Sequence, residues 1–403
     1  MSIGLMEDQP AVAGGKPVRA TFLPYGLHDV GAEEEQVVLN VLRHGWLTAG
    51  PRVREFETTF ASYVGAKYAV ALATGTAALH LTMLGLGIGP GDEVITSPLT
   101  FVATANGIVH AGGRPVFADV DPDTLNVDPV QVAKRITKRT KSLLPVHMAG
   151  APCDMRALRR IARDHKIPIV EDACHAVGAM IGDKPIGAAG DAQCFSFHPV
   201  KNMTTAEGAM VTTPHRKLAE SVRMLRFHGF REDYLSRSKS GALGYPRMHV
   251  LGFKSVLTDL QAALGLVQLK RLEGFTARRN VLAEAYNKSF ADVPELQRPT
   301  VLSGTTSAWH IYTIRLRLER LRCTRDEFMD ALKRENIGTS VHYLPVHLQP
   351  YYRKRFGFRS SDFPVAEDAY RRMLTLPLFP KMTDADQADV IRAVTRLVAY
   401  YRK

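Results

Sequence analysis

Cysteine is scarce in this chain, and no apolar run is long. Only four of the 403 residues are cysteines, and none stands in a C-x-x-C or other spacing typical of a metal site. Three lie in or beside apolar runs, so we predict buried free thiols and no zinc site. The cysteines are Cys153, Cys174, Cys194 and Cys323. No apolar run reaches the roughly 18 residues that a membrane-spanning helix needs, so no membrane partner is predicted.

A secretory signal, internal repeats and low-complexity tracts are missing as well. The first residues, MSIGLMEDQPAVAGGKP, contain no basic segment followed by an apolar one, so we expect a cytoplasmic protein. With 45% apolar and 23% charged residues, the composition is typical of a globular protein. The length suits one large domain together with a smaller one.

Positive charge exceeds negative charge by 12 at pH 7. The basic residues are spread along the chain, with short clusters at residues 52–56 (RVREF), 134–141 (KRITKRTK) and 351–359 (YYRKRFGFR). No nucleic-acid-binding motif accompanies them, so nucleic-acid binding is a distant alternative. A solvated basic surface is the first interpretation, and a preference for phosphate-bearing small molecules is the second.

Helical and strand patterns alternate from about residue 75 onward. We predict helices at residues 78–88, 101–112 and 155–166, and strands at residues 92–98, 114–120, 142–150 and 167–173. This order is typical of an α/β domain with a mostly parallel sheet covered on both faces. Because ligands of such sheets bind beyond the carboxyl ends of the strands, the residues of interest are 96–101, 145–150, 172–175 and 196–201.

The pattern changes in the C-terminal part of the chain. A long helix is predicted at residues 257–290, with Thr258 or Asp259 at its start. Strands are then predicted at residues 310–318 and 337–345, and helices at residues 324–336 and at the C-terminus. We therefore expect a large domain with an N-terminal arm, residues 1–275, and a smaller α+β domain, residues 276–403, divided inside the long helix.

Lys201 lies in CFSFHPVKNMTTAEGAM, residues 194–210, far from other charged residues. Most lysines are solvated at the surface, but this one follows a predicted strand and is surrounded by hydroxyl and amide side chains. A desolvated amine has a lowered pKa and can act as a nucleophile at neutral pH. For Glu207 in the same stretch, we predict only a buried structural contact.

Asp172 ends a predicted strand, IVEDA, and His175 follows three residues later. An acid at this place can simply cap the next helix. It can also hold a cationic ring nitrogen, because pyridoxal 5'-phosphate (PLP) needs a lysine for its Schiff base and an acid at its pyridinium nitrogen. Taken alone, Asp172 and Lys201, which are 29 residues apart (201 − 172), are a weak signal.

Two further features lie next to predicted strands. Thr74, Gly75 and Thr76 precede an apolar helix, whose free N–H groups can bind a phosphate, although a plain helix cap is equally compatible. Phe101 comes just after the strand that ends near Pro98. Its ring can stack on a planar cofactor or pack in the core.

Several motifs together resemble those of the DegT/DnrJ-type nucleotide-sugar aminotransferases, which are PLP enzymes of fold type I. They are TGTAALHL, SPLTFVATANGIVHAGGRPVFADVD, PVHMAGAPCDM, EDACHAVGA and SFHPVKNMTTAEGAM. The resemblance runs in order from about Trp46 to about residue 380. It implies an α/β fold with a mostly parallel, seven-stranded sheet between helices and a smaller C-terminal α+β domain.

The resemblance also implies roles for the candidate residues. Lys201 bonds the cofactor aldehyde and then moves a proton between cofactor and sugar carbons, while Asp172 pairs with the pyridinium nitrogen. His175 lies near the ring oxygen or the imine, and Phe101 stacks on the ring. The phosphate-binding group is Thr74, Gly75, Thr76 and Ser196, and the sugar-nucleotide region contains Thr48, Gly50, His342 and Tyr343.

The implied reaction is a ping-pong amino transfer from an amino acid, L-glutamate, to a keto nucleotide sugar in a homodimer with shared active sites. FHGF, VLGFKSVLTDLQAALGLVQL and PLFPKMT resemble enzymes that aminate C4 of a UDP-4-keto sugar, such as the UDP-4-amino-4-deoxy-L-arabinose branch. The alternatives are a sugar 3-aminotransferase, a PLP-dependent sugar dehydratase and a non-catalytic sugar-binding relative. Such dehydratases carry a histidine where Lys201 stands, and retained Lys201 and Asp172 argue against a non-catalytic protein.

Two positions depart from the family pattern. Many relatives have an asparagine near GFKSV that reaches the phosphate of the neighbouring subunit, whereas this chain has Lys254, Ser255 and Val256. We expect Lys254 to supply a charge contact there instead. Ala209 replaces the second glycine of the commoner EGG, which is tolerated unless that position needs a positive φ.

Overall fold

The computed structural model describes residues 9–231 and 247–403. The first eight residues of the stretch considered as a signal therefore lie outside the described part. Seven strands form one sheet in the order β3-β2-β4-β5-β8-β9-β1, because parallel bridges from Leu143 to Ile169 and from Val146 to Asp172 join β4 to β5. The strands are β1 (Tyr68–Leu72), β2 (Glu93–Thr96), β3 (Arg114–Phe117), β4 (Thr140–Leu144), β5 (Val170–Asp172), β8 (Ala192–Ser196) and β9 (Ala209–Thr213).

Only β9 runs against its neighbours in this sheet. It is antiparallel to both β1 and β8, whereas β2 is parallel to β3 and β4, and β5 is parallel to β8. The mostly parallel, seven-stranded sheet is therefore confirmed. Ala209 is the first residue of β9 and pairs with Leu72 and Ser196. Its φ is not among the positive values of the chain, so an alanine fits there.

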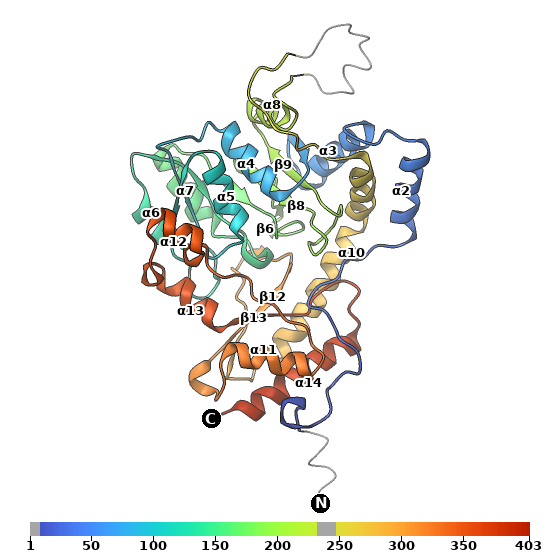
Figure 1. Cartoon of the computed structure of the whole chain (residues 1–403), viewed down its shortest axis with the longest axis vertical. Coiled ribbons are helices and arrows are strands. Elements are labelled where there is room, and N and C mark those ends of the chain that lie inside the picture. The colour runs from blue at the N-terminus through green and yellow to red at the C-terminus, as the bar shows by residue number, and fades with distance from the viewer. Residues whose placement is uncertain (1–8, 232–246) are drawn as a thin grey trace, which may run out of the picture.

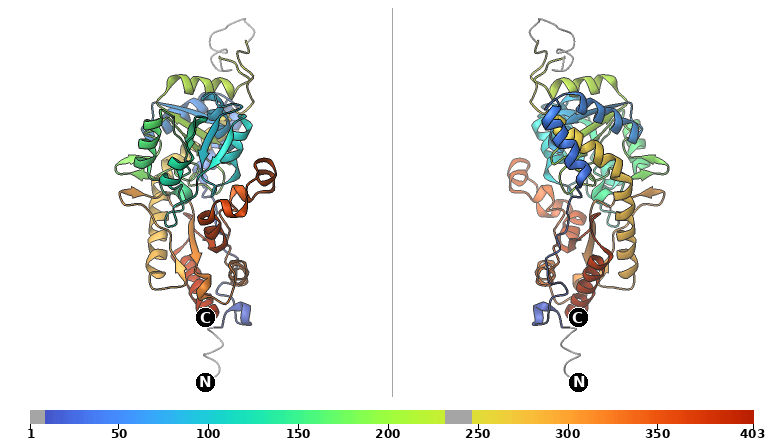
Figure 2. Two further views of the ribbon diagram at one scale, coloured as in Figure 1. Left: turned by 90° about the vertical axis from the view of Figure 1, so that its left-hand side faces the viewer. Right: turned by 90° about the vertical axis from the view of Figure 1, so that its right-hand side faces the viewer.

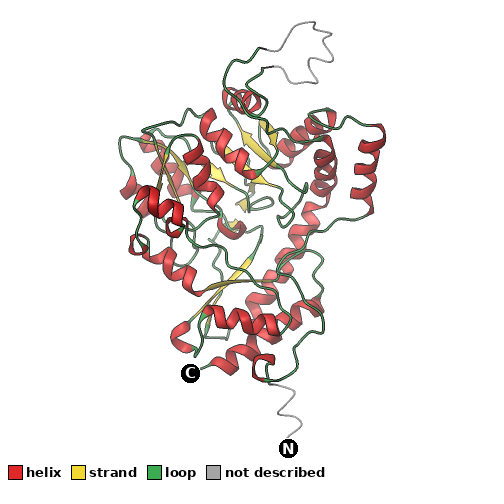
Figure 3. Cartoon of the chain, in the orientation of Figure 1, coloured by secondary structure: helices red, strands yellow, loops and turns green. Residues whose placement is uncertain are grey.

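Helices cover both faces of the sheet (Figures 1 and 3). Alternate residues of a strand point to opposite faces, and β1 shows this directly. Val70 and Leu72 pack in the same core as α4 and α8, while Ala69 and Ala71 pack with α3 and α10. The helices of this domain are α2 (Ala32–His44), α3 (Pro51–Val64), α4 (Gly75–Gly85), α5 (Val102–His110), α6 (Pro129–Arg135), α7 (Met155–His165) and α8 (Arg216–Leu225).

Helix α10 (Asp259–Ser289) runs from the large sheet to the C-terminal part of the molecule (Figure 1). Thr258 caps it as predicted, because its hydroxyl accepts a hydrogen bond from the Gln261 N–H while the Gln261 side chain accepts one from the Thr258 N–H. The small domain contains a sheet in the order β10-β12-β13. Its elements are β10 (Leu296–Gln297), β12 (Tyr312–Leu316), β13 (Met373–Leu376), α11 (Arg325–Arg334), α12 (Pro350–Phe356), α13 (Pro364–Arg372) and α14 (Asp384–Tyr401).

The strand predicted at residues 337–345 is wrong. Ser340 forms a single bridge with Thr375, after which the segment leaves the sheet and places His342 and Tyr343 in a pocket. The alternating pattern of this segment therefore reflects side chains that line the pocket, and it does not indicate a strand. A further small sheet pairs β6 (Met180–Ile181) with β7 (Lys184–Pro185) and β11 (Thr305–Thr306).

Each of the two parts of the chain contributes residues that pack on the other part, and Figure 2 shows the two parts from the side. Leu23 belongs to the same buried core as α11, α14 and β12, so N-terminal residues pack on the small domain. In return, Tyr352 and Phe363 pack with Phe117 of β3. The division at residue 275 stays a prediction, and it falls within an unbroken helix. Within the described ranges, no helix is long and apolar enough to cross a membrane.

Candidate active site

A pocket of about 430 Å³ lies at the carboxyl ends of the parallel strands. This is the place that the α/β pattern predicts for a ligand. Ten of the thirteen candidate residues line it, which brings together segments that are far apart in the sequence. They are Thr74, Gly75, Thr76, Phe101, Asp172, His175, Ser196, Lys201, His342 and Tyr343.

Asp172 is the last residue of β5 and is 4% exposed. One carboxylate oxygen accepts a hydrogen bond from the Thr104 hydroxyl at 2.7 Å, and the other accepts one from the Cys174 N–H at 3.1 Å. Thr104 is itself 2.8 Å from the Thr100 hydroxyl. The carboxylate is therefore fixed in position by neutral donors, and its charge is not cancelled by an ion pair in the described part of the chain.

Lys201 is partly buried in the same pocket. Burial lowers the pKa of its amine below the usual value, although the nearby Cys174 and Asp172 oppose that shift. Across residues 9–231 and 247–403, no hydrogen bond or ion pair engages this amine. A desolvated amine loses its proton more readily than a solvated one, and the neutral amine can attack an aldehyde.

The hydroxyl and amide residues beside Lys201 bind backbone atoms and not the amine. Asn202 donates to the Ala308 carbonyl, Thr204 to the Phe197 carbonyl, and Thr205 to the Glu207 carbonyl. They hold the turn that carries Lys201. The predicted buried contact for Glu207 is wrong, because its side chain is 55% exposed and lies 4.0 Å from His198 at the pocket.

The N-terminus of α4 and the end of β8 form a small cradle in the pocket. Thr74 caps the helix by accepting a hydrogen bond from the Ala77 N–H at 3.1 Å. A Cβ atom on Gly75 would meet the Ser196 Oγ at 3.2 Å and the Cys174 Sγ at 3.4 Å. Gly75 therefore keeps open a space between a hydroxyl and the first N–H groups of a helix, which suits the phosphate of PLP.

Phe101 and a group of rings from both domains line another side of the pocket. Phe101 is 54% exposed and its ring centroid lies 5.7 Å from that of Tyr343. The Tyr343 hydroxyl lies 3.0 Å from His175 Nε2. Burial raises the pKa of Tyr343, so its hydroxyl keeps its proton. An exposed aromatic face beside Asp172 and Lys201 fits a planar, polar ring.

The buried histidines of the pocket are neutral. Burial lowers the pKa of His175 and of His310 well below the usual value, and the positive charge of Lys201 adds to the shift in both. Burial also lowers the pKa of His342 to about 4. The His175 and His310 rings lie 4.4 Å apart, and the Nδ1 atom of each is buried with no partner in the described residues. Such orphaned nitrogens are typical of a site that completes its hydrogen bonds with a ligand.

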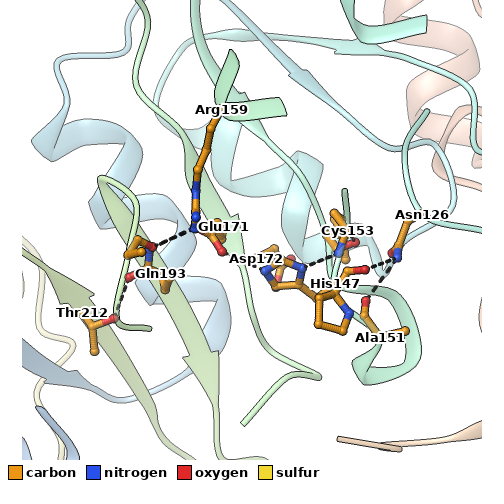
Figure 4. A network of polar contacts seen from close by, with 12 residues as sticks. Asn126, His147, Ala151, Cys153, Arg159, Glu171, Asp172, Gln193 and Thr212 are labelled. Atoms are coloured by element: carbon orange, nitrogen blue, oxygen red, sulfur yellow. Dashed lines mark hydrogen bonds and ion pairs between the residues drawn. The ribbon is translucent and has the colours of Figure 1, made fainter. Parts of the chain in front are cut away.

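A buried polar network supports Asp172 from behind (Figure 4). Glu171, one position earlier in β5, accepts hydrogen bonds from Arg159 at 3.3 Å and Gln193 at 3.2 Å. His147 Nδ1 accepts a hydrogen bond from the Cys153 N–H, so the proton lies on Nε2, which donates to Glu171 at 2.9 Å. The backbone N–H of His147 also donates a hydrogen bond to the backbone carbonyl of Asp172. The network therefore fixes the strand that carries the pocket acid.

Thr104 and His310 were missed by the sequence analysis. Thr104 stands in a predicted helix, where threonine gives no signal of its own, and only the fold places it against Asp172. His310 precedes β12 of the small domain, and hydrogen bonds from its N–H and the Ala308 N–H to the turn at Ala149 and Gly150 bring it beside His175. A histidine at the start of a strand was the only available signal.

Thr48, Gly50 and Lys254 do not line this pocket in the single chain. Thr48 forms a bridge with Thr258, and the Gly50 N–H donates to Asp259. The Lys254 amine lies 4.4 Å from the centre of the Phe227 ring. The segments that carry them border the pocket without lining it, since the Ser255 carbonyl, next to Lys254, accepts a hydrogen bond from the Ala73 N–H.

Comparisons with known proteins agree with this geometry. A sequence model of the DegT/DnrJ/EryC1/StrS aminotransferase family matches residues 28–395. The spore coat polysaccharide biosynthesis protein SpsC of Bacillus subtilis (strain 168) is 48% identical over 381 residues, which cover 94% of this chain and 98% of that protein. DesV of S. venezuelae is 37% identical with a TM-score of 0.84, covering 91% of this chain and 94% of that one. Spr1654 of Streptococcus pneumoniae, solved in PLP and PMP forms, is 30% identical with a TM-score of 0.88, covering 94% and 99%.

Proposed function

Because the chain belongs to the DegT/DnrJ/EryC1/StrS aminotransferase family, we propose that it transfers an amino group from L-glutamate to C4 of a UDP-4-keto sugar. It is a PLP-dependent sugar aminotransferase of fold type I. The donor, the nucleotide and the carbon that is aminated are the parts that we propose. They are supported by the motifs FHGF and PLFPKMT and by the excess of positive charge.

One observation carries the chemistry: a single pocket holds the Lys201 amine, the Asp172 carboxylate and the Gly75–Ser196 cradle. PLP, when bound, withdraws electrons from the carbon that bears the amino nitrogen, provided that its ring nitrogen is protonated. The fixed, unpaired charge of Asp172 is suited to keep that proton in place. The cradle would hold the phosphate, and Phe101 would cover one face of the ring.

The remaining residues explain how a proton is handled. Lys201, with its lowered pKa, can accept a proton from the donor carbon and return it to another carbon of the bound substrate. His175 and Tyr343 are hydrogen-bonded to each other and stay uncharged near neutral pH. They add hydrogen bonds at the reacting end of the pocket without competing with Lys201 for its proton.

We further propose a homodimer in which a second copy adds residues to the pocket. Thr48, Gly50 and Lys254 do not line the pocket of their own chain, and neighbouring residues in the sequence include large apolar side chains that are exposed. These are Leu47, Met248, Val250, Leu251 and Phe253. Such an exposed patch is typical of a protein interface. Sedimentation equilibrium should give a dimer, and Leu251→Lys should shift the protein toward the monomer and lower turnover.

The experiment that tests the substrate is a coupled assay with L-glutamate and a small panel of keto nucleotide sugars. The panel pairs 4-keto with 3-keto sugars on UDP and on dTDP. The proposal expects the highest kcat/KM with a UDP-4-keto sugar and amination at C4 in the product by NMR. A clear preference for a 3-keto sugar would replace this proposal with the sugar 3-aminotransferase alternative.

The role of Lys201 is tested independently of the sugar. Borohydride should fix the cofactor covalently to the peptide that contains Lys201, and Lys201→Ala should lose that adduct and turnover together. If the variant keeps the adduct and turnover, the assignment is wrong.

The presence of Lys201 argues against a sugar dehydratase and, together with Asp172, against a non-catalytic relative. SpsC is a spore coat polysaccharide biosynthesis protein, so we place this chain in the synthesis of a surface polysaccharide in the cytoplasm, which gene deletion and cell fractionation would test.

A further inference from the structure

A second cavity, of about 710 Å³, lies at the edge of the large sheet and shares no lining residue with the active-site pocket. Glu93 and Arg114, the first residues of β2 and β3, line it. All four residues of β3 line it, from Arg114 to Phe117, so it runs along the edge strand of the sheet. We call it the edge groove, and its lining is Gly91, Glu93, Arg114, Pro115, Val116, Phe117, Lys134, Arg135, Thr137, Arg139, Phe358 and Phe363.

The edge groove brings together two basic segments that the proposed function leaves unused. Residues 134–141 (KRITKRTK) and 351–359 (YYRKRFGFR) contain nine lysines and arginines and no acid. The first begins with the last two residues of α6 and the second covers most of α12, and both helices are labelled near each other in Figure 1. Lys134, Arg135 and Arg139 line the groove from the first segment, and Phe358 lines it from the second. The two segments, which we first interpreted as a solvated basic surface, therefore contribute to the lining of a cavity.

The positive charge of the edge groove is not neutralised internally. Four cations line it against one acid, Glu93, which leaves a formal charge of +3 (4 − 1). Glu93 is already engaged by Arg139 at 2.7 Å and by the Thr137 hydroxyl at 2.6 Å. Arg114, Lys134 and Arg135 have no ion pair with any described residue. Cations grouped in a concave site attract an anionic ligand.

Aromatic side chains form the other half of the lining. Phe117 and Phe363 are buried and make the floor, while Phe358 is only partly buried beside them. The Arg135 guanidinium lies 5.9 Å from the centre of the Phe363 ring, and that of Arg114 lies 5.5 Å from the centre of the Phe356 ring. Rings that hold guanidinium groups in place leave their N–H donors directed outward for phosphate oxygens.

We propose that the edge groove is a second, non-catalytic binding site for a nucleoside diphosphate. Arg114, Lys134 and Arg135 bind the two phosphates, and the base packs on the exposed face of Phe358. A single phosphate would leave most of the cavity unfilled. Basic residues of both segments continue outside the lining, so a polynucleotide is the alternative ligand that the test below separates from UDP. The site would let the enzyme respond to the nucleotide that its sugar substrates carry, without occupying the pocket at Lys201.

Binding of UDP to the PLP-loaded enzyme, measured by isothermal titration calorimetry, tests this site. Lys134→Ala/Arg135→Ala removes two charge-assisted contacts, so one class of UDP sites should weaken by at least about tenfold. Turnover at saturating substrate should stay unchanged. The matched control is Arg156→Ala/Arg160→Ala, which removes the same charge from the exposed side of α7 and should keep that class intact.

Three results would overturn the proposal: no class of sites is weakened in the groove variant, the α7 control weakens it equally, or an oligouridylate binds the groove more tightly than UDP. Pyrophosphate has two phosphates and no base, so comparing it with UDP separates the binding of the phosphates from the binding of the base. Phe358→Leu should weaken UDP about threefold and pyrophosphate not at all; if both ligands respond alike, the base contact is wrong. The measured quantity is the weakening of one class of UDP-binding sites in the groove variant. This measurement tests the edge groove whether or not the enzyme aminates a UDP sugar.

Discussion

Two walls of the active-site pocket differ in how complete they are. The acid wall, made of Thr100, Thr104 and Asp172, satisfies both carboxylate oxygens from within the large domain. The histidine wall, made of His175, His310, His342 and Tyr343, is assembled from both domains. Its His175 and His310 Nδ1 atoms are orphaned within the described chain. One wall is thus preorganised before a ligand binds, and the other reserves polar atoms for the ligand.

Asp172→Asn should break the acid wall with the largest effect. The amide keeps the shape but carries no charge to hold a protonated ring nitrogen, so turnover should fall by about 10²–10³-fold. The thermal unfolding midpoint should change little, which separates chemistry from folding. Asp154→Asn, at the N-cap of α7, is the matched control and should leave turnover unchanged. A loss of less than tenfold in Asp172→Asn would remove Asp172 from the proposed role.

His147→Leu should weaken the support behind the acid wall. It takes a donor from the buried Glu171 carboxylate and leaves the Cys153 N–H unpaired. We expect a loss of about 3 kcal/mol in the free energy of unfolding, measured with urea. His215→Leu breaks an exposed contact with Asp191 and should cost less than about 1 kcal/mol. Equal losses in the two variants would show that the network adds no special support.

Each wall contains residues that the sequence predicted and one that it did not. Asp172 was predicted and Thr104 was missed in the acid wall, while His175, His342 and Tyr343 were predicted and His310 was missed in the histidine wall. Asp172 ends a buried strand and Lys201 follows another, so the rule for parallel sheets already places them at one edge. His310 reaches the pocket only because the small domain docks on the turn at Ala149 and Gly150. A contact between domains leaves no periodic signal in the chain.

The errors in secondary structure have a related cause. The helices α4, α5, α7 and α10 follow apolar periodicity and end within a few residues of the prediction. Residues 337–345 also alternate, yet His342 and Tyr343 face the pocket and the Tyr343 hydroxyl contacts His175. Glu207 was predicted to make a buried contact, but its side chain is 55% exposed and lines the pocket. Local pattern does not distinguish a strand from a segment that lines a site.

Thr104→Val should loosen the acid wall without removing its charge. Valine has nearly the same shape, but Asp172 loses a hydrogen bond of 2.7 Å. Because a hydrogen bond to a charged group contributes about 1.5–3 kcal/mol, we expect turnover to fall about tenfold, with KM little changed. Thr104→Ser keeps the hydroxyl and should restore most of the rate. Serine as damaging as valine would show that packing, and not the hydrogen bond, is what matters.

The neutral state of the histidine wall should make the stability of the protein depend on pH. Burial lowers the pKa of His175, His310 and His342 below the unfolded value of about 6.5. Below that pH the unfolded chain binds more protons than the folded one. The free energy of unfolding should therefore fall as the pH drops from about 6.5 toward 4, by up to about 1.4 kcal/mol per pH unit for each histidine.

His310→Asn should reduce that slope by up to one histidine's share while leaving stability at pH 8 nearly unchanged. Urea unfolding at several pH values between 8 and 5 measures it. His165→Asn is the control, because it removes a histidine from the exposed end of α7 and leaves the pocket untouched. An unchanged slope in His310→Asn would mean that this ring already carries a proton when folded. It would then repel the charged Lys201 amine, and the histidine wall would lower the pKa of Lys201 directly.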